Sequence, residues 1–330
     1  MRTALTPGRM KITPALTAAA VTVAIIMAAP ASATTSCRVV NHTTGTTSRH
    51  LQPVIDAASP QDVIFIKGVC AGNFVVGKSL RFVGKATSST PEATLDGRDS
   101  GTVVTVNDAV VAVFKDVVIT NGNSADQGGG INVAGGTLTL SGDSRVKGNQ
   151  AAFFGGGIEN SGTVLLTGHA RVSGNTASVS DGGITGGGAL TMSGYSQVNG
   201  NTSTQFAGGI GSTGTVTLNE YAQVDGNHAG LHGGGIVVSG AGTLTLTGFA
   251  EVANNTAANK GGGIATENSG SITLKDSASV TGNTAGVSFG GVYDLNNQLF
   301  GCNGSGLDQW IGAISPNTPD DPPAVTLVTC

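Results

Sequence analysis

The sequence has little charge and few aromatic side chains. Charged residues make up 11% of its 330 residues, aromatic residues 4%, and the formal net charge is -4. Proteins that bind nucleic acid or anionic membranes carry clustered basic residues, but no basic run follows Arg2, Arg9 and Lys11. The composition therefore argues against nucleic acid as a partner.

The chain also lacks an uninterrupted apolar run long enough to cross a membrane. The longest, Leu16 to Ala29, lies behind a basic N-terminus and ahead of the small-residue sequence Ala31-Ser32-Ala33. This order is typical of a cleaved secretory signal, whereas a spanning helix needs about 18 or more apolar residues. We predict a signal peptide over 1–33, a secreted, extracellular product, and no stable membrane insertion.

Cysteine is scarce, and all four cysteines follow the expected cleavage site. An even number in an oxidising compartment predicts disulfides, and four cysteines allow three pairings. Their clustering near the two ends favours Cys37 with Cys70 and Cys302 with Cys330.

Glycine is abundant, with 53 residues, and it recurs at a fixed period. Gly-Asn occurs at Gly122-Asn123 and then every 26 residues to Gly226-Asn227, and it continues with a spacing of 28 as Asn254-Asn255 and Gly282-Asn283. A Gly-Gly-aliphatic sequence follows the same period and ends at Ile131, Ile158, Ile184, Ile210, Ile236, Ile264 and Val292. Such periods indicate a solenoid or another repeat architecture.

Each repeat predicts three short strands and leaves no room for a helix. Segments such as "GTLTLSG" (136–142) alternate apolar residues with threonine, as half-buried strands do. Winding each repeat once around an axis places equivalent strands side by side and parallel. We predict an all-β fold, a single parallel β-helix with 26–28 residues per coil, and right-handed coils because parallel crossovers are right-handed.

The regions flanking the repeats predict the domain limits. Leu51, Val54, Ile55 and Ala58 have helical spacing, so a short helix is expected to cover the open end of the first coil. We predict an N-terminal cap over 34–62, the β-helix over 63–300, and a C-terminal cap over 301–330 closed by a disulfide.

Equivalent asparagines are expected to stack at one corner of the coil, where an inward amide needs hydrogen-bond partners. This structural ladder comprises Asn149, Asn175, Asn201, Asn227, Asn255 and Asn283. The glycine before each asparagine allows the positive φ of a sharp bend, and the glycine triplets are expected to turn another corner with close backbone approach.

The repeats "GGGIxN" and "VxGNTA", together with "VIDAASPQDVIFIKGVCAGNF" (54–74), resemble secreted bacterial parallel β-helix proteins. They are similar to the repeats of the chlamydial polymorphic outer-membrane proteins, whose marks are GGAI and FxxN. Here glycine replaces the usual alanine, as in Gly157-Ile158, and valine often replaces phenylalanine. No autotransporter barrel is expected after the repeats. The resemblance covers about 51–299 and implies the fold.

One motif points to chemistry that its context argues against. "GNFVVGKS" (72–79) matches a phosphate-binding loop, which requires a following helix. The next residues alternate like a strand and run into a proline, so we expect no nucleotide. His169, His228 and His232 occupy different positions of their repeats, so no metal site is predicted.

A β-helix also suggests an enzymatic alternative, since many parallel β-helices resemble pectate lyases and other polysaccharide-cleaving enzymes. These need carboxylates and usually an arginine or lysine on one face. The candidates are Asp126, Glu159, Asp181, Arg145 and Arg171. This alternative admits calcium as a cofactor; otherwise none is expected.

The best-marked surface feature is a column of aromatic residues, Tyr195, Tyr221 and Phe249, at equivalent positions of successive repeats. Exposed aromatic side chains in a row favour contacts with sugars or a partner surface. We therefore predict a non-catalytic, secreted or envelope-associated protein with a binding or structural role, whose partner is a polysaccharide or a cell-surface component. A polysaccharide lyase or glycoside hydrolase is the alternative.

Overall fold

The computed structural model describes residues 36–86, 92–287, 290–294 and 299–302. The chain divides into two units, Met1–Thr34 and Thr35–Cys330, and the described residues all belong to the second. The expected signal peptide over 1–33 therefore lies outside the described residues, as does the expected C-terminal cap from residue 303 onward.

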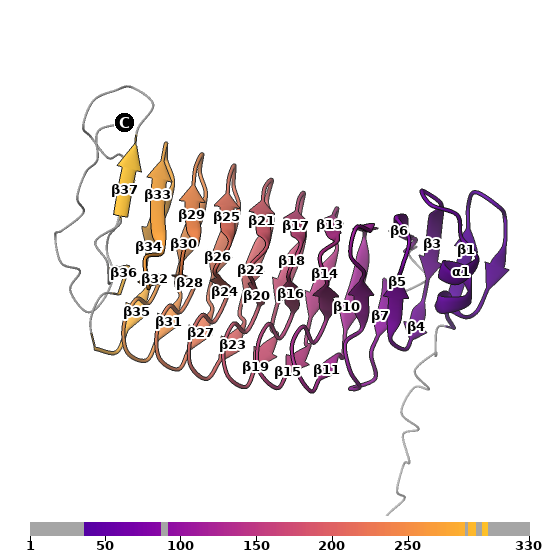
Figure 1. Ribbon diagram of the computed structural model, residues 1–330, viewed down its shortest axis with the longest axis horizontal. Helices are drawn as coiled ribbons and strands as arrows, with labels where there is room; N and C mark the ends of the chain where they lie inside the picture. Colours follow the sequence, from indigo (N-terminus) through magenta and orange to yellow (C-terminus); the bar gives the residue numbers. More distant parts are fainter. Residues whose placement is uncertain (1–35, 87–91, 288–289, 295–298, 303–330) are drawn as a thin grey trace, which may run out of the picture. The chain divides into compact units, whose positions relative to one another are not determined.

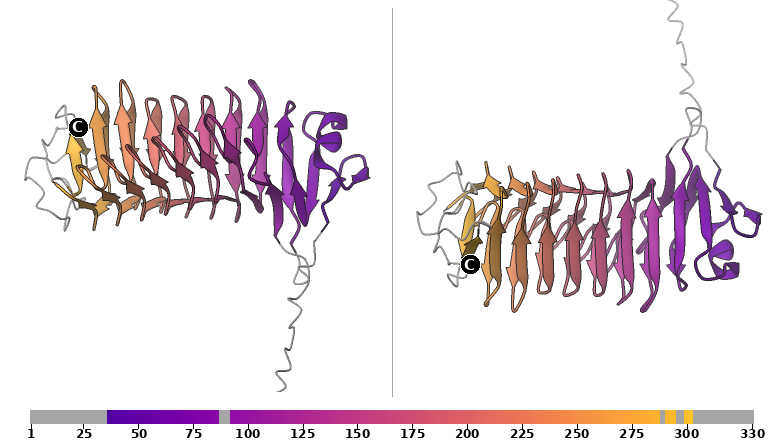
Figure 2. Two further views of the ribbon diagram at one scale, coloured as in Figure 1. Left: turned by 90° about the horizontal axis from the view of Figure 1, so that it is seen from below. Right: turned by 90° about the horizontal axis from the view of Figure 1, so that it is seen from above.

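The second unit is a parallel β-solenoid of about eight turns, which confirms the predicted all-β fold. A typical coil contains β16 (Ile158–Asn160), β17 (Thr163–Leu166), β18 (Arg171–Ser173) and β19 (Thr176–Ala177). Each strand pairs in parallel with its equivalent in the next coil, so neighbouring coils lie side by side (Figures 1 and 2). The coil thus has four strands, whereas we predicted three. The strand missing from the prediction is β19, which is only two residues long.

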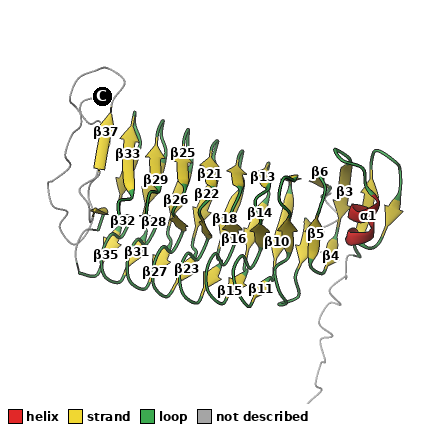
Figure 3. Ribbon diagram, in the orientation of Figure 1, coloured by secondary structure: helices red, strands yellow, loops and turns green. Residues whose placement is uncertain are grey.

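The strands form four sheets (Figure 3). The twelve-stranded sheet contains, in spatial order, β2 (Thr47–Ser48), β1 (Arg38–Asn41), β3 (Val63–Lys67), β6 (Leu80–Gly84), β9 (Val111–Lys115), β13 (Thr137–Ser141), β17, β21 (Ala189–Met192), β25 (Thr215–Leu218), β29 (Thr243–Leu246), β33 (Ser271–Lys275) and β37 (Leu299–Cys302). The seven-stranded sheet contains β11 (Asn123–Ser124), β15 (Gln150–Ala151), β19, β23 (Thr202–Ser203), β27 (His228–Ala229), β31 (Thr256–Ala257) and β35 (Thr284–Ala285).

The other two sheets have nine strands each, and we name them after one strand. The β18 sheet contains β4 (Val69–Ala71), β7 (Ala93–Asp96), β10 (Val117–Thr120), β14 (Arg145–Lys147), β18, β22 (Gln197–Asn199), β26 (Gln223–Asp225), β30 (Glu251–Ala253) and β34 (Ser279–Thr281). The β16 sheet contains β5 (Phe74–Val76), β8 (Val104–Val106), β12 (Ile131–Val133), β16, β20 (Ile184–Gly186), β24 (Ile210–Ser212), β28 (Ile236–Ser239), β32 (Ile264–Glu267) and β36 (Val292–Asp294).

The core follows from the alternation of apolar and polar residues along each strand. In β13, Leu138 and Leu140 are fully buried, whereas Thr137 and Thr139 point outward. Because the strands of successive coils are in register, each inward side chain packs on its equivalent one coil away. The core is therefore one continuous column of valine, leucine and isoleucine, which no single repeat could form alone.

The first coils are covered by a helix and an antiparallel hairpin. Helix α1 (Leu51–Ala57) buries Leu51, Val54 and Ile55 against β1, β2 and β5, while β1 pairs antiparallel with both β2 and β3. A disulfide joins Cys37 to Cys70 across this region. Apolar surface at the end of the coil is thus covered.

The asparagine corner has one backbone conformation in every coil. The residue before each ladder asparagine has a φ near +60°, as at Gly174 (+61°) and Gly200 (+62°), and Asn254 adopts the same conformation with +53°. The first Gly-Asn pair is different. Asn123 aligns with Gln150, so Gly122 takes the place of a ladder asparagine and donates its N–H to Asn149 at 2.9 Å.

The glycine triplets lie at the corner before the β16 sheet, where coils approach closely. A Cβ placed on Gly157 would lie 2.6 Å from the carbonyl oxygen of Gly183 and 2.8 Å from Val172. In the coils from Gly128 to Gly261 the first triplet position has a positive φ, including +61° at Gly155 and +64° at Asp181. These glycines shape the corner. In two adjacent coils the first triplet position is not glycine but Asp181 and Ala207, and Ala207 also has a positive φ, +46°.

Candidate functional site

Four aromatic rings form a ladder at the corner between the twelve-stranded sheet and the β18 sheet. His169, Tyr195, Tyr221 and Phe249 stack in this order, with centroids 5.4, 5.0 and 5.2 Å apart and planes within 9° of parallel. Each residue lies in the same turn of its coil, since its N–H donates to the turn of the preceding coil. We call these four residues the aromatic ladder.

The ladder is open to solvent along its outer side. Tyr195 is 54% exposed, Tyr221 47% and Phe249 58%. Rings about 5 Å apart leave no space for a sugar ring between them, because carbon atoms need about 3.5–4.0 Å on each side. The ladder therefore presents ring edges and the tyrosine hydroxyls along its length.

The two ends of the ladder differ from its middle. Asp143 precedes His169 in the column, and Ser277 follows Phe249. Among the described residues, no ring is stacked on the Phe249 face that points toward Ser277. The serine side chain is too small to cover a phenyl ring, so this face remains accessible to a ligand.

A ladder of polar side chains runs beside the aromatic ladder on the β18 sheet. The Nε2 group of Gln197 donates to Oε1 of Gln223 at 2.8 Å, and Gln223 donates to Glu251 at 3.3 Å. Gln197 lies two residues after Tyr195 in the same coil, and both side chains reach the solvent.

A second candidate site lies on the outer side of the β16 sheet, where two adjoining pockets bring the predicted acids onto one face. Asp126 and Glu159 line a pocket of about 450 Å³. Glu159 and Asp181 line another of about 360 Å³, together with Thr185 and Glu267. The three predicted carboxylates therefore share a groove with Glu159 at its centre.

Asp181 is held in this groove at a conformational cost. Its φ is +64°, a left-handed conformation that is unfavourable for most side chains. Part of the residue reaches the surface, but its carboxyl group packs over Gly211. A Cβ atom added to Gly211 would lie 1.9 Å from Oδ1 of Asp181. Burial raises the pKa of Asp181 to about 7, and the hydrogen bond that Thr185 donates at 2.5 Å opposes this increase.

Glu159 is 9% exposed and lies on β16, next to Thr185 of β20. Burial raises the pKa of its carboxyl group, the hydrogen bond from Ser161 at 2.6 Å lowers it, and the charge of Asp126 raises it further. Carboxylates with raised pKa values in one pocket are a recognised feature of acid–base sites.

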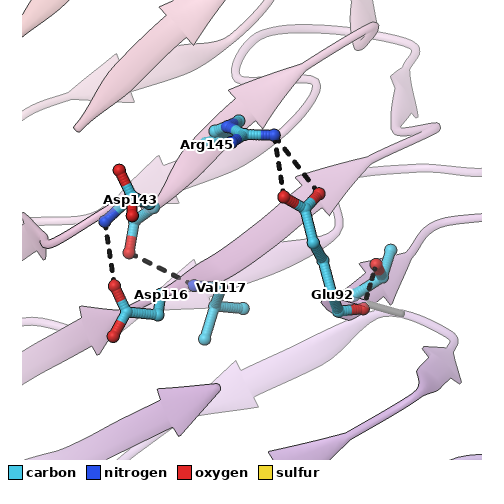
Figure 4. Close-up of polar contacts among 7 residues, drawn as sticks. Glu92, Asp116, Val117, Asp143 and Arg145 are labelled. Carbon is cyan, nitrogen blue, oxygen red and sulfur yellow. Dashed lines mark hydrogen bonds and ion pairs between the residues drawn. The ribbon is translucent and has the colours of Figure 1, made fainter. Parts of the chain in front are cut away.

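The two candidate arginines lie elsewhere. Arg145 and Arg171 pair across β14 and β18, so they belong to the β18 sheet and not to the groove. Arg145 forms an ion pair with Glu92 at 2.9 Å (Figure 4). The predicted combination of acids with an arginine on one face is therefore not assembled.

Another ring column covers part of the β16 sheet. Phe206 and His232 stack at 5.7 Å, and His232 lies 6.0 Å from Tyr293. Lys260 places its Nζ 4.7 Å from the Tyr293 ring. Phe206 and Tyr293 pack with Val237 and Ala265 in a small apolar cluster, and Phe206 and Val237 also line the groove.

The stretch that matches a phosphate loop is a wall of the solenoid. It contains β5 and continues into β6 without a helix. Lys78 donates instead to the carbonyl oxygens of Asp56 and Ala58 at 2.5 and 2.9 Å, at the C-terminal end of α1. A cation there is favourable because of the helix dipole.

In the part of the chain that the structure describes, no group of three or more His, Cys, Asp or Glu side chains could hold a metal ion. No helix among those residues is long and apolar enough to span a membrane. The stacked coils define the chain as a parallel β-solenoid. Comparison with family models, curated proteins and solved structures finds no match.

Proposed function

We propose that this protein is a secreted, non-catalytic β-solenoid that binds an extracellular polysaccharide or cell-surface glycan along the aromatic ladder. The observation that carries the proposal is the exposure of Tyr195, Tyr221 and Phe249 in one continuous, parallel stack. Only 4% of the residues are aromatic, yet four rings, counting His169, line one corner. Secretion is supported by the signal-like N-terminus and by the Cys37–Cys70 disulfide.

The geometry suggests how a glycan would be held. An extended chain would run along the solenoid axis, contact the ring edges, and use the tyrosine hydroxyls together with Gln197 and Gln223 for hydrogen bonds. A terminal or bent sugar unit would stack on the free face of Phe249 beside Ser277. Such combined apolar and polar contacts are what amphipathic aromatic residues provide.

Binding to a panel of immobilised acidic and neutral polysaccharides tests this proposal. We expect the double variant Tyr195→Ala, Tyr221→Ala to bind the retained polysaccharide at least tenfold more weakly, about 1.4 kcal/mol. Ser277→Ala leaves the Phe249 face uncovered and should bind like the wild type. Unchanged retention of the folded double variant would show that the ladder only stabilises the fold.

A second candidate function, cleavage of a polysaccharide in the groove, is favoured by one specific observation. Asp181 has a pKa of about 7 and lines the same pocket as Glu159. Polysaccharide hydrolysis by paired carboxyl groups needs one protonated group that donates to the leaving oxygen and a second that is ionised. Asp181 would be the acid and Glu159 the partner.

Incubating the protein with the same polysaccharides, with and without calcium, distinguishes the two functions. Unsaturated or reducing-end products that disappear in Asp181→Asn and persist in Asp276→Asn would replace the binding proposal with the enzymatic one. Asp276 is a suitable control because it also has a positive φ, +57°, but lies at the turn next to the aromatic ladder.

A further inference from the structure

The twelve-stranded sheet carries an unusually uniform outer surface over six coils. Two outward columns run across β13, β17, β21, β25, β29 and β33, and we call them the hydroxyl face. The first column is Thr137, Thr163, Ala189, Thr215, Thr243 and Ser271, and the second is Thr139, Leu165, Thr191, Thr217, Thr245 and Thr273. The side chains between the two columns point inward and are buried.

The hydroxyl face is a regular two-dimensional array. Adjacent strands of a sheet are about 4.8 Å apart, and alternate residues of one strand are about 6.7 Å apart. These six strands run side by side with little rotation between them (Figures 1 and 2), whereas open sheets normally twist by about 20° per strand. Because β-branched threonine is restricted at χ1, its hydroxyl and methyl groups also repeat in orientation.

The face is uncharged, and its hydroxyls are mostly free of protein partners. No Asp, Glu, Lys or Arg occupies either column. Within the described residues, the one side-chain hydrogen bond between column members joins Thr243 to Thr215 at 3.5 Å, which is long. The remaining hydroxyls can therefore hydrogen-bond to ordered first-shell water.

We propose that the hydroxyl face binds the surface of ice. A flat array of alternating methyl and hydroxyl groups can hold water at fixed positions, and the lattice repeats of hexagonal ice are close to the two spacings of the face. The match to a crystal surface depends on repetition in two directions, which a flat solenoid provides and a twisted sheet does not.

The same observations disfavour other occupants. A crystalline polysaccharide surface would be expected to contact aromatic rings, and neither column contains one. A second copy of the chain would be expected to bury apolar residues at the centre of its interface, but only Ala189 and Leu165 are apolar here. An ionic surface is disfavoured because neither column contains a charged side chain. Ice is the partner whose chemistry requires only ordered hydroxyl and methyl groups.

Nanolitre osmometry of the purified chain tests the proposal by measuring the gap between the melting and freezing temperatures over a concentration series. We expect a gap that grows with protein concentration, together with faceted crystals. Thr217→Tyr places a bulky ring at the centre of the array and should reduce the gap to the buffer baseline, as should Thr245→Lys one coil further. Ser173→Tyr, on the outer side of the β18 sheet, is the matched control and should retain the gap.

Circular dichroism of each variant shows whether the solenoid is intact, so loss of the gap in a folded Thr217→Tyr protein supports the proposal. The Tyr195→Ala, Tyr221→Ala variant should keep the gap, which separates this inference from glycan binding. The proposal is overturned if the wild type shows no gap, or if both Thr217→Tyr and Thr245→Lys retain it. It is also overturned if the wild type shows no gap but forms dimers in sedimentation, or binds to cellulose, and Thr217→Tyr abolishes that association.

Discussion

The side-chain amide of Asn175 donates a 2.9 Å hydrogen bond to Oδ1 of Asn201, which lies 26 residues later and one coil further along the solenoid. The same oxygen accepts the backbone N–H of Asn175 at 3.0 Å. Asn201 in turn donates to the carbonyl of Val172 and to Asn227, and it is completely buried. Asn201 therefore finds acceptors for its own side-chain amide, and its oxygen accepts both the side-chain and the backbone N–H groups of Asn175.

Replacing Asn201 by alanine should destabilise the solenoid strongly. The change leaves the N–H and amide groups of Asn175 without their acceptor inside the core, and each unsatisfied buried group costs about 1–3 kcal/mol. We expect a loss on the order of 3 kcal/mol in urea unfolding followed by circular dichroism.

Asn123→Ala is the matched control for that prediction. Asn123 follows a glycine as Asn201 does, yet its side chain is exposed because the first repeat is shifted by one residue. Its replacement should change stability by less than about 0.5 kcal/mol. Equal effects of the two substitutions would contradict the role of the ladder.

Two glycines of one repeat should respond differently to alanine, because one lacks space and the other needs a special conformation. At Gly157 the new Cβ would lie 2.6 Å from a backbone oxygen, so we expect a loss on the order of 3 kcal/mol from overpacking. At Gly174 the space is open but φ is +61°, so alanine should cost about 1–2 kcal/mol.

Asparagine at position 174 should cost less than alanine, because Asn254 has the same conformation in its own coil. Urea midpoints of Gly157→Ala, Gly174→Ala and Gly174→Asn measure this order. If Gly174→Ala were the most damaging of the three, the positive φ at the asparagine corner would matter more than close packing at the triplet corner.

Periodicity alone was sufficient to predict the solenoid, because a repeat of 26 residues with alternating strands has few ways to bury its apolar side chains. The two-residue strand β19 could not be predicted, since two residues show no alternation. The shift at Gly122-Asn123 is visible in the sequence only as a mismatch, because this dipeptide precedes the next one by 26 residues while Ile131 precedes Ile158 by 27. Pairing with Gln150 shows that it is Asn123 that is displaced.

One of the two candidate sites could be predicted from the sequence, and the other could not. A shared column was enough to place Tyr195, Tyr221 and Phe249 together, since equivalent positions must stack. The groove depends on how the corner before the β16 sheet folds over that sheet, which brings Glu159 and Asp181 into one pocket although they occupy different positions of their repeats. Sequence spacing contains no such information.

The Cys37–Cys70 disulfide should stabilise the N-terminal end of the solenoid. It closes a sequence separation of 33 residues, for which the loss of chain entropy in the unfolded state corresponds to about 3–4 kcal/mol. We expect Cys37→Ala with Cys70→Ala to increase hydrogen exchange in β1, α1 and β3 more than in β25.

Cys302 and Cys330 are predicted to form the second bond, and the side chains of both lie outside the described residues. Peptide mapping of the non-reduced protein checks this pairing. A Cys302–Cys330 peptide is expected, and a peptide that joins Cys302 to Cys37 or Cys70 would refute it.

Asp181 should make the protein less stable as the pH rises toward neutrality. Its pKa is raised from 3.8 to about 7 in the folded protein, so between these values the folded state holds a proton that the unfolded state has released. Stability therefore falls with increasing pH across this window. The carboxyl of Glu159, whose pKa is also raised, contributes in the same direction.

Urea unfolding of the wild type and Asp181→Asn at a series of pH values between 4 and 8 measures this effect. Asparagine tolerates the left-handed conformation and has no charge to bury, so Asp181→Asn should flatten the decrease, with a gain on the order of 2 kcal/mol at pH 8.

Asp276 provides the opposite control. Hydrogen bonds from Thr247 and Gly248 lower the pKa of its carboxyl, so its contribution is present above the unfolded pKa and is lost as the pH falls. Asp276→Asn should therefore leave the decrease between pH 4 and 8 intact. If the difference in stability between the wild type and Asp181→Asn stayed constant across that range, the pKa of Asp181 would not be raised in the groove.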